Sequence, residues 1–121
     1  MLIKRELVLD TETTGLNVDN GDRIIEIAII ELLDNMKTNR LFHKLVNPEK
    51  EISKSAMKIH GISNEQLFDK PKFKDIAKEL IEFIGDSNIV IHNAAFDLKF
   101  LNFELENCGY NKISNNVIDT L

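Results

Sequence analysis

The spacing of apolar residues changes once along this chain, and that change limits the folds it can adopt. Before residue 48, three apolar runs at residues 6–12, 23–33 and 41–46 have the length and the Ile, Val and Thr content typical of strands. Asn47-Pro48 closes the third run with a turn signal. We therefore expect three successive strands that pair as an antiparallel meander.

Further along the chain, apolar residues recur at helical spacing. Residues 73–84 carry them on one side and charged residues on the other, and Gly85 stands where a helix commonly ends. The remaining expected elements are a short buried strand at 88–91, a helix at 94–107 ended by Cys108-Gly109, and the start of a strand at 117–121. Strands followed by alternating helices and strands predict an α/β fold with a mixed five-stranded sheet and flanking helices.

Length and composition fit one domain. With 121 residues and 43% hydrophobic content, the chain can bury one substantial core but not two, so we expect residues 1–121 to form a single domain. The single cysteine, Cys108, cannot form an internal disulfide, and no apolar run approaches the ~20 residues needed to cross a bilayer. These features predict a cytoplasmic protein with no membrane partner.

The net charge of −5 argues against one kind of nucleic-acid binding. An acidic chain is not expected to grip long nucleic acid through a broad basic surface, because Lys and Arg contacts with phosphates normally supply that affinity. A site that holds divalent cations can still present local positive charge to one or two phosphates.

Asp10 and Glu12 belong to the sequence LDTETTGL at the end of the first expected strand. Because side chains alternate along a strand, both should lie on one face, roughly 7 Å apart at the backbone, with Leu9 and Thr11 on the other. Two ionised carboxylates there are costly unless a cation lies between them, and their hard oxygen ligands suit Mg²⁺ or Mn²⁺. A solvated strand end is the commoner explanation for an isolated Asp-X-Glu.

Asp97 ends a second group, VIHNAAFD, in the first turn of the helix expected at 94–107. Its interaction with the helix dipole would alone explain its position. In the same group we expect Asn93 to cap the helix, His92 to be structural and Phe96 to pack in the core.

Together these two groups resemble the first and second motifs of the DEDD exonuclease superfamily, which has a ribonuclease-H-like fold. The resemblance is close for the epsilon (DnaQ-like) proofreading subunits of bacterial DNA polymerase III and covers nearly the whole chain. It extends to residues 25–27 (IEI), 59–62 (IHGI) and 117–121 (VIDTL). Matching order and spacing at five places is a specific signal.

The resemblance implies a proofreading 3′–5′ DNA exonuclease that releases nucleoside monophosphates from a single-stranded 3′ end. Asp10, Glu12 and Asp97 would be catalytic and would bind two divalent cations, Mg²⁺ or Mn²⁺. The implied substrate-binding residues are Asp10, Glu12, Thr13, Leu16, Ser55 and His60. The implied partner of the full-length parent protein is the catalytic (alpha) subunit of DNA polymerase III.

Two departures from the family pattern limit these implications. The family's third motif supplies a His general base and a fourth carboxylate on a later helix, and residue 121 precedes it. We therefore expect a domain truncated at its C-terminal end, without its last helices, that alone is inactive or nearly so. In addition, Ser55 stands where close relatives often have Glu, five residues before His60.

Purely structural explanations for two histidines, and two alternative functions, stay open. His60 also fits a loop histidine bonded to backbone, and His43 matches no functional position and is read as a surface strand residue. An RNA-directed exonuclease of the oligoribonuclease type would share the chemistry and differ in its tolerance of a 2′-hydroxyl. A truncated, non-catalytic fragment that binds a polymerase partner would lack the chemistry altogether.

Overall fold

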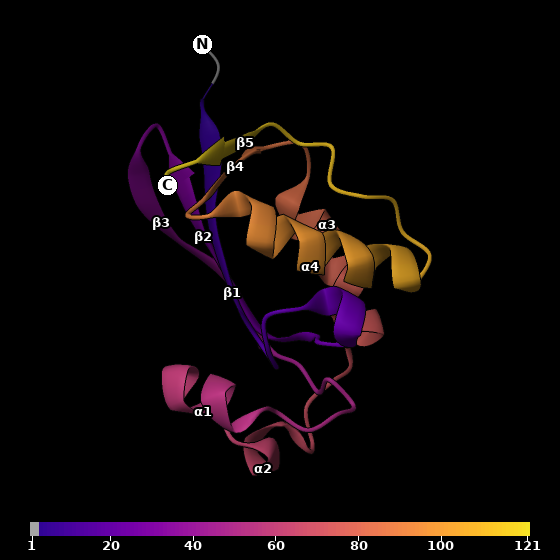
Figure 1. Ribbon diagram of the computed structural model, residues 1–121. Helices are drawn as coiled ribbons and strands as arrows, with labels where there is room; N and C mark the ends of the chain where they lie inside the picture. The colour runs from indigo at the N-terminus through magenta and orange to yellow at the C-terminus, as the bar shows by residue number, and fades with distance from the viewer. Residues whose placement is uncertain (1–2) are drawn as a thin grey trace.

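The computed structural model describes residues 3–121 and contains one mixed sheet (Figure 1). Its strands are β1 (Arg5–Thr13), β2 (Ile24–Leu33), β3 (Met36–Leu45), β4 (Asn88–Ile91) and β5 (Val117–Asp119). They lie in the order β3-β2-β1-β4-β5. The β1–β2 and β2–β3 pairs are antiparallel, whereas β4 runs parallel to β1 and β5 parallel to β4. The expected mixed five-stranded sheet is therefore confirmed.

Five helical segments accompany the sheet in the described part of the chain. They are η1 (Val18–Asn20), α1 (Lys54–His60), α2 (Asn64–Leu67), α3 (Phe73–Ile84) and α4 (Ala94–Asn107). In Figure 1, α3 and α4 lie together beside the sheet, whereas α1 and α2 lie beyond the end of β1. Within residues 3–121, no helix is long and apolar enough to span a membrane.

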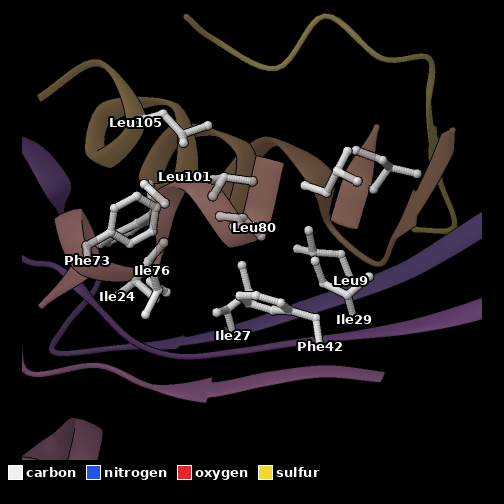
Figure 2. Packing of buried hydrophobic residues seen from close by; sticks show 14 of the residues in the cluster. Leu9, Ile24, Ile27, Ile29, Phe42, Phe73, Ile76, Leu80, Leu101 and Leu105 are labelled. Atoms are coloured by element: carbon white, nitrogen blue, oxygen red, sulfur yellow. The ribbon is translucent and has the colours of Figure 1, made fainter. Parts of the chain in front are cut away.

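The main core lies between the sheet and the α3–α4 pair (Figure 2). Along β1 burial alternates, so that Leu7 and Leu9 are buried while Val8 is exposed, as the period of a strand requires. Leu80 of α3 and Leu101 of α4 are fully buried against this face. The alternation places the two faces of β1 in different environments, and the carboxylates belong to the more open one.

The structure confirms most of the expected elements and corrects the bounds of four strands, by one or two residues except at the start of β3. α3, β4 and α4 have the bounds expected from the sequence. The third strand was expected to begin at residue 41, but β3 begins at Met36. Asp34 and Asn35 both have positive φ, 49° and 68°, and form the tight turn that joins β2 to β3. The exposed and mostly polar first half of β3 carries no apolar signal, so only this turn could have revealed it.

The short helices α1 and α2 were not expected from the sequence. They pack on a second small cluster of buried residues that includes Ile25, Ile52 and Leu67. Ser53 caps α1 by accepting a hydrogen bond from the backbone N–H of Ala56, and Gly61 ends it in the left-handed conformation. These caps were a readable signal, and they show that residues 54–60 are helical rather than a loop.

Candidate active site

Asp10 and Glu12 lie near the end of β1 on its more open face. Asp10 is exposed and Glu12 half-buried, while their neighbours Leu9 and Thr11 are buried. Burial raises the pKa of Glu12, and the negative charge of Asp10 raises it further. The two carboxylates are therefore close enough to repel one another, as their shared face predicts.

Asp97 approaches the same strand from the first turn of α4. The side chain is buried, and its Oδ1 accepts a hydrogen bond from the hydroxyl of Thr11. Burial is the main cause that raises the pKa of Asp97 to about 6, and the charges of Asp10 and Glu12 add to it while the Thr11 bond opposes it. All three predicted catalytic carboxylates therefore influence one another electrostatically.

The turn before α4 is held by a residue that the sequence reasoning did not single out. Asn93 occupies the cap position with φ of 63°, but its side chain makes no capping hydrogen bond. The Asp119 carboxylate instead accepts hydrogen bonds from the backbone N–H groups of Asn93 and Ala94, at 3.1 Å each. The expectation that Asn93 caps the helix is thus right in position and wrong in mechanism, because a carboxylate from β5 satisfies these donors.

The three carboxylates do not form a closed cage. As the side chains of residues 3–121 stand, no three of His, Cys, Asp or Glu converge closely enough to enclose a metal ion. Asp97 is oriented by Thr11, whose side chain points to the buried face of β1, whereas Asp10 and Glu12 occupy the open face. The site therefore has two carboxylates on the open face of β1, and a third, Asp97, that is bonded to a residue of the buried face.

A pocket of about 470 Å³ adjoins the open face of β1. Among the residues that line it are five of the predicted site residues: Glu12, Thr13, Leu16, Ser55 and His60. Asp10 and Asp97 do not line it. Sequence reasoning missed other lining residues, including Asn17, Asp22 and Ile59. The structure thus brings together five of the six predicted substrate-binding residues, all except Asp10, and Glu12 is the one predicted catalytic carboxylate among them.

One wall of this pocket is the turn that follows β1. Leu16 at its tip is 83% exposed and lines the pocket, so its side chain is accessible to a bound ligand. Asp22 holds the turn: its Oδ1 accepts from the Thr14 hydroxyl at 2.8 Å and its Oδ2 from the backbone N–H of Asn17 at 3.0 Å. Lys50 adds an ion pair to Asp22 at 3.1 Å.

The facing wall is α1, which carries Ser55, Ile59 and His60 into the lining. The Nδ1 of His60 accepts a hydrogen bond from the backbone N–H of Ile62 at 3.0 Å, so the expected bond to backbone is present, although His60 ends α1 rather than lying in a loop. His60 Nε2 is buried and has no hydrogen-bond partner within residues 3–121. Buried polar atoms are normally hydrogen-bonded. The Nε2 of His60 is an exception among the described residues, and this residue lines the pocket.

Three other residues lie largely as expected. His43 is on β3, where its Nε2 lies 2.7 Å from a carboxylate oxygen of Glu26. His92 makes a structural contact, with Nδ1 3.2 Å from the Thr120 hydroxyl. Phe96 packs against the core, as expected, and also lines the pocket.

Comparison with known proteins decides the family. The family model described as exonuclease (RNase T) matches residues 7–121. The chain belongs to this exonuclease family. Its fold supports the assignment: a solved structure of exonuclease I with inhibitor BCBP superposes with a TM-score of 0.89 over all of this chain and 29% of that one, at 18% identity. The ribonuclease-H-like architecture is therefore confirmed.

Other known proteins are more similar to this chain in sequence than exonuclease I is. The DNA polymerase III subunit epsilon of Rickettsia prowazekii (strain Madrid E) is 50% identical over 121 residues, covering 97% of this chain and 53% of the relative. That of Buchnera aphidicola subsp. Baizongia pistaciae is 44% identical over 125 residues, 97% of this chain and 51% of the relative. Exonuclease X in complex with 5′-overhanging duplex DNA is 30% identical, with a TM-score of 0.73, over 95% of this chain and 59% of that one. The exonuclease chain thus spans about half the length of the curated relatives it matches.

Proposed function

We propose that this chain provides the metal-binding part of a 3′–5′ DNA exonuclease that proofreads for a replicative DNA polymerase. The observation that carries the proposal is the mutual influence of Asp10, Glu12 and Asp97 beside a pocket that Glu12 lines. Three carboxylates in such a position fit hydrolysis of a phosphodiester better than they fit a structural role, because unpaired repulsion between them costs stability.

The donor set fits divalent cations. Carboxylate oxygens are the hard ligands that Mg²⁺ and Mn²⁺ prefer, and a cation would relieve the repulsion that raises the pKa of Glu12 and Asp97. Exonucleases of this superfamily depend on divalent metals. We propose that Asp10 and Glu12 would bind a cation through their carboxylates, and that Asp97 would contribute to a second cation, directly or through water.

Two cations bound there would supply a nucleophilic water and charge for the leaving 3′ oxygen. The protein's own part in this reaction is to fix the geometry. Asp10 and Glu12 are held on β1 by its pairing with β2, opposite Ala28 and Glu26, while β4 pairs only with residues 6–8 of β1. Thr11 orients Asp97, which carries a full negative charge once the pH is well above its pKa of about 6.

The pocket fits a terminal nucleoside. Leu16 and Ile59, 83% and 80% exposed, belong to its opposite walls and would flank a base with apolar contacts. Thr13, Ser55 and His60 add polar groups to the lining, and the unpaired Nε2 of His60 is available to a sugar or phosphate oxygen. Ser55 is shorter than the Glu often found at this position and would give a weaker contact.

Relatives named DNA polymerase III subunit epsilon, about half identical to this chain, support a DNA substrate and a polymerase partner. We propose that residues 1–121 belong to one exonuclease domain, that its substrate is a single-stranded 3′ end, and that its partner is the polymerase catalytic (alpha) subunit. An RNA oligonucleotide of the same sequence tests the oligoribonuclease alternative.

The deciding experiment combines metal binding with 3′-end release. Mn²⁺ binding is measured by electron paramagnetic resonance, and nucleotide release from a single-stranded DNA oligonucleotide by gel analysis, for the wild type, Asp10→Asn and Asp86→Asn. Asp86 is an exposed carboxylate in the turn after α3, so its variant is the matched control. We expect only Asp10→Asn to lose Mn²⁺ affinity, and we expect any nucleotide release by the wild type to be slight and to disappear in Asp10→Asn.

Each other outcome has a definite meaning. Equal Mn²⁺ binding by the wild type and Asp10→Asn would overturn the carboxylate assignment. Mn²⁺ binding that depends on Asp10 without nucleotide release would leave the carboxylate assignment standing, because residues 1–121 alone are expected to be inactive or nearly so. Equal release from DNA and RNA would favour the oligoribonuclease alternative.

A further inference from the structure

Helix α1 is the only helical segment within residues 3–121 that contains no acidic residue, although strands β3 and β4 also lack one. The whole chain has 20 Asp and Glu against 15 Lys and Arg, yet α1 reads KSAMKIH, with Lys54 and Lys58 both exposed. Its surface is therefore a local region of positive charge on a protein whose net charge is −5.

The two lysines lie on one side of α1, beside the pocket. Residues four apart on a helix are neighbours on its surface, about 6 Å apart along the axis, so Lys54 and Lys58 form one short row. Ser55 and Ile59, each one residue further on, form the next row and line the pocket. Ala56 and His60, which also line the pocket, lie still further around the helix. The lysine row is therefore next to Ser55 and Ile59 on the exposed side of α1 and points away from the pocket.

Neither lysine is neutralised by a neighbour in the described part of the chain. No ion pair involves Lys54 or Lys58, whereas Lys50, just before the helix, is paired with Asp22 at 3.1 Å. The pocket lining itself contains carboxylates but no Lys or Arg. Lys54 and Lys58 are therefore unpaired cations on the helix that forms one wall of the pocket, whereas the charge of Lys50 is paired with Asp22.

Helix stability does not account for Lys54. The N-terminal end of a helix carries partial positive charge, so a cation in the first turn is mildly unfavourable there. Ser53 already caps this end through its side chain. The position of Lys54 therefore requires a reason other than the stability of α1, and an anionic ligand outside the pocket supplies one.

We propose that Lys54 and Lys58 bind the backbone phosphates of the DNA strand next to its 3′-terminal nucleotide. The terminal nucleoside occupies the pocket, and the strand leaves it over the exposed side of α1, where each ammonium group contacts a phosphate. This inference rests on the proposed function and extends it, because the protein would bind several nucleotides of the strand rather than the terminal nucleotide alone.

The test uses salt dependence, which counts phosphate contacts. Affinity for a fluorescent single-stranded DNA is measured by anisotropy at several salt concentrations with Mn²⁺, using a phosphorothioate 3′ linkage to prevent hydrolysis. The variants are Lys54→Gln/Lys58→Gln and, as control, Lys74→Gln/Lys78→Gln. The control pair has the same spacing and exposure but lies on α3.

The expected result is quantitative. Each phosphate contact to a single strand contributes ~0.7 to the slope of log affinity against log salt, so the α1 double variant should lower the magnitude of the slope by about 1.4. The loss of affinity between about 50 and 200 mM salt should then be ~7-fold smaller than in the wild type. The α3 control should keep the wild-type slope.

A mononucleotide separates this inference from the proposed function. Binding of a deoxynucleoside monophosphate with Mn²⁺ should be the same in the wild type and the α1 double variant, because the lysines lie outside the pocket. If the wild type binds no mononucleotide, the proposed function itself is overturned. If it does, and the α1 variant has the same salt slope for DNA as the control, the lysine row is only a solvated helix surface and this inference is wrong.

Discussion

The hydroxyl of Thr11 donates a hydrogen bond to the carboxylate of Asp97, and so joins β1 to the first turn of α4. Thr11 stands between Asp10 and Glu12 in the sequence, but its side chain points to the buried face of the strand. Burial raises the pKa of Asp97 to about 6, and the Thr11 bond opposes this rise. Thr11 therefore controls both the orientation and the ionisation of Asp97.

Replacing Thr11 by Val should raise the pKa of Asp97 further and destabilise the fold. The variant keeps the shape of the side chain but leaves a buried carboxylate without its donor, at a cost of about 1–3 kcal/mol. Thr11→Ser keeps the hydroxyl and should leave the pKa of Asp97 near its wild-type value. Urea unfolding gives the stability, and a carboxyl-carbon NMR titration gives the pKa. An unchanged pKa in Thr11→Val would show that the bond has no effect on Asp97.

Asp97→Asn should stabilise the metal-free protein more at pH 7.5 than at pH 4. A carboxyl whose pKa is raised on folding favours the folded state at low pH, and this advantage is lost as the pH rises through the folded pKa of about 6. Above that pH the wild type buries a charge that Asn lacks, while Asn can still accept the Thr11 bond. The gain in the free energy of unfolding should be at most about 3 kcal/mol, which corresponds to a pKa raised from 3.8 to about 6.

Thermal unfolding in EDTA across this pH range measures the effect. Asp86→Asn, at an exposed carboxylate, is the control and should follow the wild type at every pH. A gain from Asp97→Asn that does not change between pH 4 and pH 7.5 would mean that Asp97 ionises as readily as an exposed residue.

The sequence was sufficient where one local pattern decides the structure. The alternation in β1 predicted that Asp10 and Glu12 share the open face, and the helical spacing of Phe73–Ile84 predicted α3 with its observed bounds. Both patterns follow from burial on one side of a regular element, which needs no knowledge of the rest of the fold.

What sequence reasoning missed depends on contacts between distant residues. Asp119 holds the turn at Asn93 from 26 residues away, and Arg5 caps the end of α3 through the carbonyls of Phe83 and Ile84, 78 and 79 residues away. Such contacts leave no periodic signal. The α1 helix was missed for another reason, since its seven residues are too few to establish a period and only its Ser53 and Gly61 caps mark it.

Arg5 and Glu31 form a buried ion pair whose disruption from one side should be costly. Glu31 is 2% exposed, and its carboxylate accepts from Arg5 Nε at 2.6 Å and from Arg40 at 3.2 Å. Arg5→Met should destabilise the protein by about 3 kcal/mol, because Arg40 alone must then compensate a buried charge. The double variant Arg5→Met/Glu31→Met should lose less than the sum of the two single variants.

Lowering the pH should remove the difference in stability between the wild type and Arg5→Met. The Arg5 hydrogen bond lowers the pKa of Glu31 below its ordinary value of 4.5, so the pair contributes stability above that pH and loses it as the pH falls through the folded pKa. Urea unfolding at pH 7 and at pH 3 compares the wild type with Arg5→Met. If the two proteins differ as much at pH 3 as at pH 7, Arg5 acts mainly by capping α3 rather than by pairing with Glu31.

Gly15 and Asp22 should be strongly coupled, because the turn that carries Leu16 leaves no room for a side chain at residue 15. A Cβ added at Gly15 would lie 2.5 Å from Asp22 Oδ2, the atom that accepts from the backbone of Asn17. Gly15→Ala should therefore displace the Asp22 carboxylate and cost about 1–3 kcal/mol, the usual range for overpacking. In an Asp22→Ala background the same change should cost much less, since the obstructing carboxylate is gone.

Changes at Gly15 should affect substrate binding as well as stability. Because the Asp22 contacts hold the turn, Gly15→Ala should also move Leu16 and weaken binding of a deoxynucleoside monophosphate, while Mn²⁺ binding through Asp10 on β1 should persist. Urea unfolding of the four proteins of the cycle gives the coupling energy, and mononucleotide titration in Mn²⁺ gives the binding effect. Equal costs of Gly15→Ala with and without Asp22 would show that the turn relaxes around residue 15, and Leu16 would then be positioned by contacts other than those of Asp22.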